Sequence, residues 1–299
     1  MGAEDGAQLT RRNSLDADQA RAVRSLAEHV GAHDGFEALS EQMLLNLTSA
    51  RTESAPAPAR EVQHLLLSRA GGLIGYAQID DGAAELAIDP AWRGRGLGRR
   101  LLLEVLAEPG VRVWAHGDLP AAAHLADQLD LARVRDLWVM AMDPPQTVPP
   151  QRRREGMLVR EFVPGQDEDA WLDLNARAFA DHPEQGKLTR ADLEERMAQP
   201  WFDPSAFFLA ADSATGDLLG SMWLKIEDGV GEIYALGVHP QAQGRGIGGL
   251  LTDRAMTALA GAGLDRLELY VEGENTAAIR TYRHVGFAKE RADVQYARA

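Results

Sequence analysis

The sequence contains no cysteine in its 299 residues. This absence excludes disulfide bonds, thiolate nucleophiles and cysteine-ligated metal sites. Any nucleophile or base of the protein must therefore be an oxygen or nitrogen group. We also expect no metal cofactor.

Long apolar runs are absent as well. No stretch reaches the roughly 18 apolar residues that a helix needs to cross a bilayer. The first six residues, MGAEDG, have neither the apolar core of a signal peptide nor the serine or threonine of a myristoylation signal. We expect a cytoplasmic protein that does not bind membranes.

Basic residues are too few for a nucleic-acid-binding surface. The chain has 31 lysines and arginines against 45 acidic residues, which gives a formal net charge of −14. Phosphate backbones and anionic lipids need basic surface, so neither is an expected partner. The compact basic run at 152–154 lies in a proline-rich stretch, and we interpret it as a solvated linker rather than a binding patch.

The length and an internal repeat both indicate two domains, and we expect a monomeric chain. At about 150 residues per domain, 299 residues suggest two. A glycine-rich turn around Gly94 recurs 150 positions later around Gly244. The proline-rich segment 143–156 is typical of a spacer, so we expect domains at 1–142 and 157–299.

The two halves share one order of elements, read as two helices, three strands, a helix, a strand, a helix and a strand. Apolar residues at helical spacing predict a first helix at 17–30 with Asp16 as its N-cap. Alternating apolar runs predict strands, among them 83–88 and 232–238, which lead into the two glycine turns. This order predicts an α/β fold with a mixed sheet in each half.

Residues 238–248 read VHPQAQGRGIG and join a strand to a helix through glycines. Glycines allow the backbone to approach a ligand closely, and a helix N-terminus favours negative charge. The stretch is therefore a candidate phosphate cradle. The copy at 88–98 reads IDPAWRGRGLG.

Several ligands could occupy such a turn. A P-loop requires Lys and Ser or Thr after the glycines, whereas Gly248 is followed by Gly249 and Leu250. A dinucleotide fold needs an early βαβ unit, but this turn follows a β-hairpin. The diphosphate of acyl-coenzyme A needs the same cradle, and an ordinary glycine-rich loop remains an alternative for a single copy.

The segment 238–248 resembles the V-x-P-x-x-[R/Q]-G-x-G-x-G/A signature of the GNAT superfamily of acetyl-CoA-dependent N-acetyltransferases. The stretch 275–287, NTAAIRTYRHVGF, resembles the next motif of that superfamily. The resemblance implies tandem GNAT domains, with coenzyme A wedged between two splayed strands and acetyl-CoA as co-substrate. In the first half it implies the contacts Leu86, Ala87, Ile88, Arg93, Gly94, Arg95, Gly96, Leu97, Gly98 and Arg99. In the second half it implies Leu236, Gly237, Val238, Gln243, Gly244, Arg245, Gly246, Ile247, Gly248 and Gly249, followed by Asn275, Thr276, Ala277, Ala278, Ile279 and Arg280.

A narrower resemblance covers almost the whole chain. The segments 178–186, AFADHPEQG, and 196–204, RMAQPWFDP, look like the mycothiol synthase family of actinobacteria. That family acetylates the cysteine amine of desacetylmycothiol (Cys-GlcN-Ins), so the resemblance implies this small-molecule partner. It also implies the substrate-binding residues Glu41, Glu184, Lys225, Glu232 and Tyr270. Another GNAT enzyme with a different amine substrate, or a non-catalytic acyl-CoA sensor, remains an alternative.

Acetyl transfer to an amine requires donors for the developing oxyanion, a base for the amine and an acid for the leaving thiolate. Glu232, on the strand before the glycine turn, is the candidate base, directly or through water. Tyr282, on the helix of the second motif, is the candidate acid. Backbone N–H groups at 236–238 can serve the carbonyl if this strand is bulged, as the resemblance implies.

The first half lacks both candidate groups. The 150-residue repeat places Gly82 opposite Glu232, and the later helices place Ala126 opposite Tyr282. We therefore expect the first half to keep a coenzyme A cradle, or a relic of one, without catalysing the reaction.

Overall fold

The structure is a computed structural model that describes residues 6–47, 62–145, 154–180, 182 and 185–298. The chain divides into two compact units. Unit 1 comprises 1–137 and 291–299, and unit 2 comprises 138–290. Each is described here by itself.

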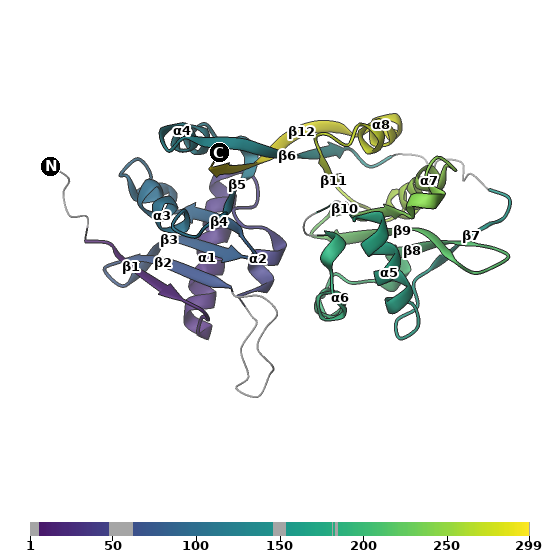
Figure 1. The fold of residues 1–299 in the computed structure, drawn as a ribbon, viewed down its shortest axis with the longest axis horizontal. Coiled ribbons are helices and arrows are strands. Elements are labelled where there is room, and N and C mark those ends of the chain that lie inside the picture. The colour runs from purple at the N-terminus through teal and green to yellow at the C-terminus, as the bar shows by residue number, and fades with distance from the viewer. Residues whose placement is uncertain (1–5, 48–61, 146–153, 181, 183–184, 299) are drawn as a thin grey trace. The chain divides into compact units, whose positions relative to one another are not determined.

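Unit 1 has helices on both faces of a mixed sheet (Figure 1). Its sheet begins β1-β2-β3-β4-β5-β12, with β4 and β5 parallel and the other printed pairs antiparallel. The strands are β1 (Gln8–Arg12), β2 (Gln63–Arg69), β3 (Gly72–Asp80), β4 (Ala83–Ile88), β5 (Arg112–Ala115), β6 (Leu131–Met142) and the last strand of the chain, β12 (Ala288–Arg298). The helices are α1 (Ala17–Asp34), α2 (Glu41–Leu45), α3 (Leu97–Val105) and α4 (Pro120–Gln128).

Local sequence explains the main helix of unit 1. The Asp16 side chain caps α1 by accepting a hydrogen bond from the Gln19 N–H. The Gln19 side-chain oxygen in turn accepts one from the Asp16 backbone N–H. This capping box satisfies helix-end donors that would otherwise be unpaired. The buried face of α1, which includes Val23 and Leu26, packs on one side of the sheet, while α3 covers a second core on the other side.

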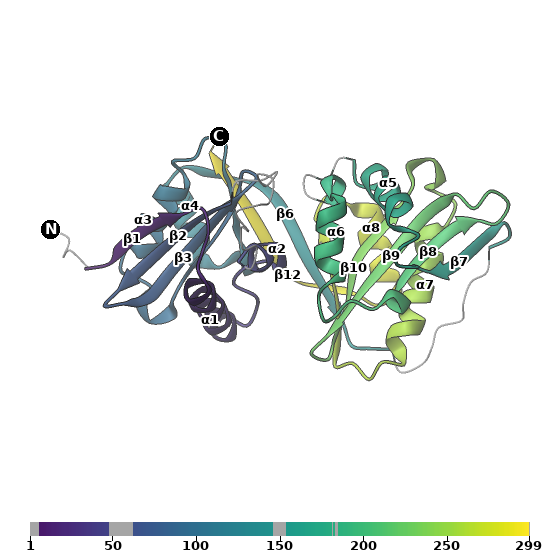
Figure 2. The same cartoon turned by 90° about the horizontal axis from the view of Figure 1, so that it is seen from below.

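Unit 2 repeats this layered plan (Figure 2). Its strands follow the order β6-β11-β10-β9-β8-β7, with β10 and β11 parallel and β7 to β10 antiparallel. The strands are β7 (Met157–Glu161), β8 (Phe207–Asp212), β9 (Leu218–Glu227), β10 (Val230–Val238) and β11 (Arg266–Glu272). The helices are α5 (Glu168–Ala178), α6 (Arg190–Met197), α7 (Ile247–Ala260) and α8 (Thr276–Val285).

The two faces of this sheet bury different side chains. Helices α7 and α8 cover an aliphatic core that contains Leu224, Ile233 and Leu269. Helices α5 and α6 cover an aromatic core built on Trp171, Trp201, Phe207 and Trp223. Because side chains alternate along a strand, each position of β9, β10 and β11 can be assigned to one face or the other.

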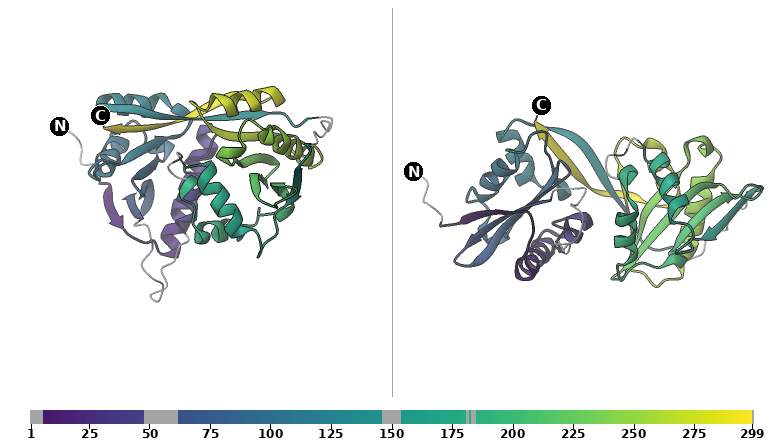
Figure 3. Two further views of the ribbon diagram at one scale, coloured as in Figure 1. Left: turned by 45° about the vertical axis from the view of Figure 1, so that its right-hand side comes forward. Right: turned by 60° about the horizontal axis from the view of Figure 1, so that its bottom comes forward.

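The last strand returns to unit 1, which differs from the expected division at 142 and 157. Residues Arg112–Ala115 of β5 pair antiparallel with Val294–Ala297 of β12. Figure 3 shows β12, drawn in yellow, beside the teal strand β6, its neighbour in the sheet. Contacts therefore assign 291–299 to the unit that begins the chain, whereas the sequence pattern had placed them in the second domain.

The mixed α/β architecture agrees with the expected fold class, and the strand at 83–88 has the predicted bounds. Strand β1 was not predicted, and the strand at 232–238 begins two residues earlier, at Val230. The proline-rich stretch lies mostly outside the described residues. Within the described part of the chain, no helix is both long and apolar enough to cross a bilayer.

Candidate active site

Two parallel strands of unit 2 separate at the point where the glycine motif begins. Strands β10 and β11 pair from Val230 with Arg266 as far as Ile233 with Leu269. Beyond that pair, the described residues of β10 continue to Val238 without a partner on β11. The strands are thus splayed as expected, and the backbone of Leu236–Val238 on the β11 side is available to a ligand.

A β-bulge lies at the start of this opening. The antiparallel register of β10 and β9 runs regularly to Ile233 opposite Leu224, and resumes with Ala235 opposite Trp223. Tyr234 is the extra residue, and bulges re-aim the side chains around them. The Tyr234 hydroxyl accepts a hydrogen bond from Nε of Arg196 on α6 at 2.9 Å. The strand before the turn is therefore bulged, as the catalytic interpretation requires.

The glycine turn follows directly. A short 3-10 helix at Pro240–Ala242 leads to Gly244 and Gly246, whose φ angles of 75° and 78° lie in the left-handed region that glycine adopts readily. Helix α7 begins at Ile247, and its first intrahelical bond runs from the Leu250 N–H to the Gly246 carbonyl. The N–H groups of Ile247, Gly248 and Gly249 therefore have no intrahelical acceptor.

The start of α7 lies close against the sheet. A Cβ at Gly220 of β9 would meet the Ile247 side chain at 2.8 Å and the Gly237 carbonyl at 3.0 Å. Gly220 therefore allows the helix N-terminus to approach the open strand end. Gln243, Gly244 and Arg245 are exposed, as residues that receive a ligand must be.

Three of the predicted substrate-binding residues lie on one face of the sheet. Lys225 of β9 is directly opposite Glu232 of β10, and both alternate with residues of the aliphatic core. Tyr270 alternates with Leu269 and Val271, which are also in that core. All three side chains are half-buried and belong to the face covered by α5 and α6.

Aromatic rings lie on the same face of the sheet, and one of them contacts Lys225. The Lys225 ammonium lies 5.2 Å from the Trp201 ring centroid, a cation–π distance. The Tyr234 ring packs against Trp201 and Trp223, with centroids 5.2 Å and 5.1 Å away. Rigid rings beside a lysine and a carboxylate form a surface suited to a polar ligand with apolar edges.

Tyr282 lies on the opposite face. It is 5% exposed within the aliphatic core, and its ring contacts Phe287 edge-on. Burial raises the pKa of its phenol, so the hydroxyl is protonated at neutral pH. Among the described residues, none hydrogen-bonds to this hydroxyl, and its oxygen is not one of the fully buried polar atoms that lack a partner.

The second motif forms the start of α8. The Asn275 side-chain oxygen accepts the Ala278 N–H at 3.0 Å and so caps the helix. Thr276 to Arg280 make up its first turns, of which Ile279 is buried. The structure thus gives Asn275 a helix-capping role, in addition to its expected contact with coenzyme A.

Unit 1 has the same turn but a different strand before it. Gly94 and Gly96 have φ angles of 72° and 80°, and β4 separates from β5 after Glu85. The register of β3 and β4 is unbroken, so β4 has no bulge. The positions that correspond to Glu232 and Tyr282 are Gly82, which lies in a turn, and Ala126, which is buried. Unit 1 therefore has neither a carboxylate nor a phenol at these positions.

The predicted contact Arg93 has protein partners in unit 1. Its guanidinium makes two hydrogen bonds of 2.7 Å with Asp34 at the end of α1, and its Nε donates to the Ile88 carbonyl at 3.1 Å. This hydrogen bonding with Arg93 lowers the pKa of the Asp34 carboxyl. Arg95 folds over the Trp92 ring at 4.7 Å. Both side chains thus help to hold the turn itself.

The remaining predicted residues fall elsewhere. Glu41 is the first residue of α2 in unit 1, and Glu184 lies outside the described residues. Sequence reasoning assigned no role to His182, whose Nε2 lies 3.6 Å from Glu272 at the end of β11. Its Nδ1 accepts the Gln185 N–H at 3.1 Å. The sequence could have indicated His182 as a site residue, because it belongs to the 178–186 motif that also contains Glu184.

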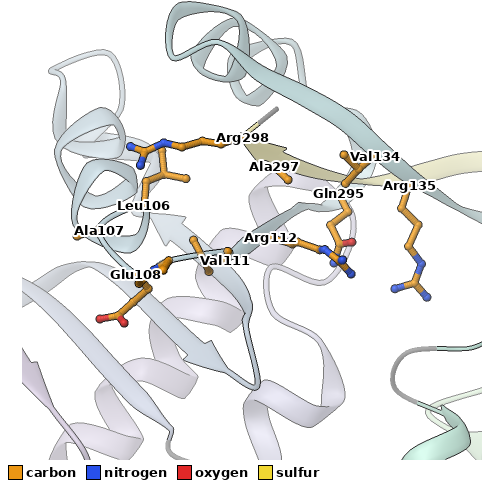
Figure 4. A pocket seen from close by; sticks show the side chains of 12 residues that line it. Leu106, Ala107, Glu108, Val111, Arg112, Val134, Arg135, Gln295, Ala297 and Arg298 are labelled. Atoms are coloured by element: carbon orange, nitrogen blue, oxygen red, sulfur yellow. The ribbon is translucent and has the colours of Figure 1, made fainter.

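Unit 1 also has an open pocket of about 680 Å³, at the opposite end of α3 from the glycine turn (Figure 4). It lies between the end of α3, the start of β5 and the paired strands β6 and β12. Figure 4 shows the guanidinium groups of Arg112, Arg135 and Arg298 pointing in three different directions. The pocket therefore does not form a convergent anion site.

Comparisons with known proteins agree with this geometry. Residues 169–287 match the Acetyltransferase (GNAT) family, and residues 60–128 match the Acetyltransferase (GNAT) domain. The chain is 46% identical over 309 residues to the mycothiol acetyltransferase of Cellulomonas flavigena, covering 95% of this chain and 87% of that protein. It is 44% identical over 297 residues to that of Streptomyces coelicolor, covering 94% and 92%.

Solved structures support the tandem fold. A GCN5-related N-acetyltransferase from Sphaerobacter thermophilus has a TM-score of 0.70 at 25% identity and covers 96% of this chain and 94% of its own. A tandem GNAT protein from the clavulanic acid biosynthesis pathway has a TM-score of 0.72 at 16% identity, with 97% of both chains covered, and shows the fold alone. The chain consists of two GNAT domains and belongs to the mycothiol acetyltransferase family.

Proposed function

We propose that unit 2 transfers the acetyl group of acetyl-CoA to the cysteine amine of desacetylmycothiol and so forms mycothiol. The observation that carries this proposal is the bulge at Tyr234, followed by the splayed end of β10 and the glycine turn. Unit 1 has the turn and a strand opening without the bulge, which supports a single catalytic centre in unit 2.

The glycine turn and α7 hold the diphosphate, and the two α8 turns after Asn275 contact coenzyme A beside the opening. Backbone N–H groups between Leu236 and Val238 stabilise negative charge on the carbonyl oxygen. Glu184, Lys225 and Tyr270 bind the hydroxyls and charged groups of the acceptor.

Glu232 accepts a proton from the acceptor ammonium, directly or through water, which frees the nitrogen lone pair. The nitrogen then forms a bond to the thioester carbon and loses its second proton to water, and the carbon–sulfur bond breaks. Tyr282 donates its proton to the departing sulfur, so that coenzyme A leaves as a thiol. Proton exchange with water resets both side chains.

An acetyl-transfer assay with purified protein, acetyl-CoA and Cys-GlcN-Ins tests this proposal. Because acceptor and product both carry thiols, the reaction is best followed by mass spectrometry rather than with a thiol reagent. We expect one acetyl group on nitrogen, stable to mild hydroxylamine that cleaves thioesters. If the protein acetylates a different amine but does not acetylate Cys-GlcN-Ins, the proposed substrate is wrong.

A further inference from the structure

Arg154 lies beside the glycine turn of unit 2, although the basic run that contains it predicted a solvated linker. Its guanidinium occupies the space that a side chain at Gly246 would need. The Cζ atom is 2.9 Å and the Nε atom 3.3 Å from the position of a Cβ built on that glycine. Gly246 is the N-cap of α7 and offers no side-chain cap of its own.

The backbone places Arg154 here through a turn just before β7. The Arg154 carbonyl accepts the Met157 N–H at 3.2 Å, and Gly156 takes the positive φ angle of 75° that this turn requires. A direct connection to the sheet therefore fixes the base of this side chain. The backbone of Arg154 is placed by its short connection to Met157, the first residue of β7.

The guanidinium of Arg154 lies in a positively charged environment. In the part of the chain that the structure describes, no carboxylate forms an ion pair with Arg154. The group instead lies against the positive end of α7, where three N–H groups have no intrahelical acceptor. A cation beside a helix N-terminus is unfavourable by itself and becomes favourable when an anion lies against both.

We propose that Arg154 is a phosphate-binding residue of the co-substrate site, and that it and the α7 N-terminus hold the diphosphate of acetyl-CoA between them. This inference deepens the proposed function and rests on it only for coenzyme A in this turn. Arginine suits the role because its planar fork makes two parallel hydrogen bonds to phosphate oxygens, whereas lysine acts as a point charge.

Unit 1 offers a comparison within the same molecule. A Cβ at the corresponding Gly96 would have no described atom within 4 Å, so no side chain of the described residues covers this turn as Arg154 covers Gly246. Arg93 is held by Asp34, and Arg95 lies over Trp92. The added phosphate contact is therefore a property of the second turn.

The test compares wild-type protein with Arg154→Gln, Arg154→Lys and the control Arg298→Gln, an exposed arginine of unit 1. Steady-state kinetics are measured with acetyl-CoA, its 3′-dephospho form and S-acetylpantetheine, which lacks the diphosphate. We expect Arg154→Gln to raise KM for the first two about 5- to 20-fold, as for a charge-assisted hydrogen bond that is partly exposed. The kcat value and the KM for the amine stay unchanged, and Arg154→Lys recovers part of the loss.

The kcat/KM for S-acetylpantetheine should be equal in wild type and Arg154→Gln. An effect confined to acetyl-CoA, with none for the 3′-dephospho form, would assign Arg154 to the 3′-phosphate and overturn the diphosphate assignment. A similar loss with S-acetylpantetheine would show an indirect structural role, and no difference from Arg298→Gln would remove the proposal.

Calorimetric titration with coenzyme A, without any acceptor, separates this inference from the substrate assignment. If Cys-GlcN-Ins is not the substrate, Arg154→Gln still weakens one coenzyme A site by the same factor. Unchanged binding in this titration contradicts the Arg154 assignment, whatever amine the enzyme uses.

Discussion

Glu232 and Tyr282 lie on opposite faces of the sheet of unit 2. Glu232 belongs to the face of α5 and α6, whereas Tyr282 is buried with the aliphatic core under α7 and α8. The two can serve one reaction only through the opening that starts after Ile233 and Leu269. In the proposed mechanism, the amine approaches from one face and the sulfur departs toward the other.

Replacing Glu232 with Gln should lower kcat about 10²- to 10⁴-fold, because the amide cannot take the proton of the amine. The KM for acetyl-CoA should change little. Glu227→Gln is a matched control, since Glu227 is an exposed carboxylate on β9 that pairs with Lys225 at 3.4 Å. Steady-state kinetics with both substrates check this prediction, and equal losses in the two variants would argue against Glu232 as the base.

Replacing Tyr282 with Phe should lower kcat without lowering stability. The hydroxyl has no hydrogen-bond partner among the described residues, so its removal leaves no protein group unsatisfied. Urea unfolding should give an equal or higher free energy of unfolding. Tyr296→Phe, in β12, controls for loss of a phenol elsewhere. If Tyr282→Phe keeps the wild-type kcat, Tyr282 is not the acid and contributes only to packing.

Equivalent glycines of the two turns should differ in their effect on catalysis. Gly94→Ala and Gly244→Ala place alanine at φ angles of 72° and 75°, with open space around each Cβ, so the backbone strain is comparable. We expect Gly244→Ala to reduce kcat/KM for acetyl-CoA severalfold and Gly94→Ala to leave it within twofold. The same reduction in both variants would contradict a single catalytic centre.

Unit 1 contains a buried histidine between two carboxylates. His116 Nε2 lies 3.1 Å from Glu85, and its Nδ1 lies 3.0 Å from Asp293 of β12. Burial alone would lower the His116 pKa, but the charge of Glu85 and the hydrogen bond with Asp293 outweigh it and raise the pKa from 6.5 to about 10. Burial raises the pKa of Asp293, and the bond with His116 more than reverses this, so that its net pKa is lowered.

These shifts set the sign of a pH dependence. The histidine contribution is complete below pH 6.5 and is lost as pH rises toward 10, while the Asp293 contribution is lost as pH falls below 3.8. His116→Ala should cost about 3–5 kcal/mol near pH 6, since it leaves two buried carboxylates without their cation. Urea unfolding at pH 6, 8 and 9.5 should show the difference shrinking, with the exposed His124→Ala as control. A constant difference would exclude titration of His116 in this range.

Local signals in the sequence predicted much of this structure. The Asp16 cap, the strand leading to Ile88 and both glycine turns depend on neighbouring residues, and the structure confirms them. The site residues Lys225, Glu232 and Tyr270 share a face because side chains alternate along a strand. Their catalytic and binding roles remain predictions.

Other features have no local signature. The bulge at Tyr234 depends on the register with β9, and the position of Arg154 depends on a turn that brings a linker residue onto a helix end. The pairing of β5 with β12 joins Ala115 to Val294, across all of unit 2 in the chain. The order of elements predicts a last strand after residue 287 but does not identify its partner.

Because β5 pairs with β12, the N-terminal unit is synthesised first but cannot complete its sheet first. A ribosome makes β5 long before β12, so unit 1 emerges without the strand that carries Asp293 and the fully buried Val294. Until the last strand arrives, β5 has an unpaired edge and His116 lacks one of its carboxylates. The N-terminal unit therefore finishes folding only after the C-terminal unit has been translated, and a nascent chain halted before residue 291 would expose an incomplete sheet to chaperones and proteases.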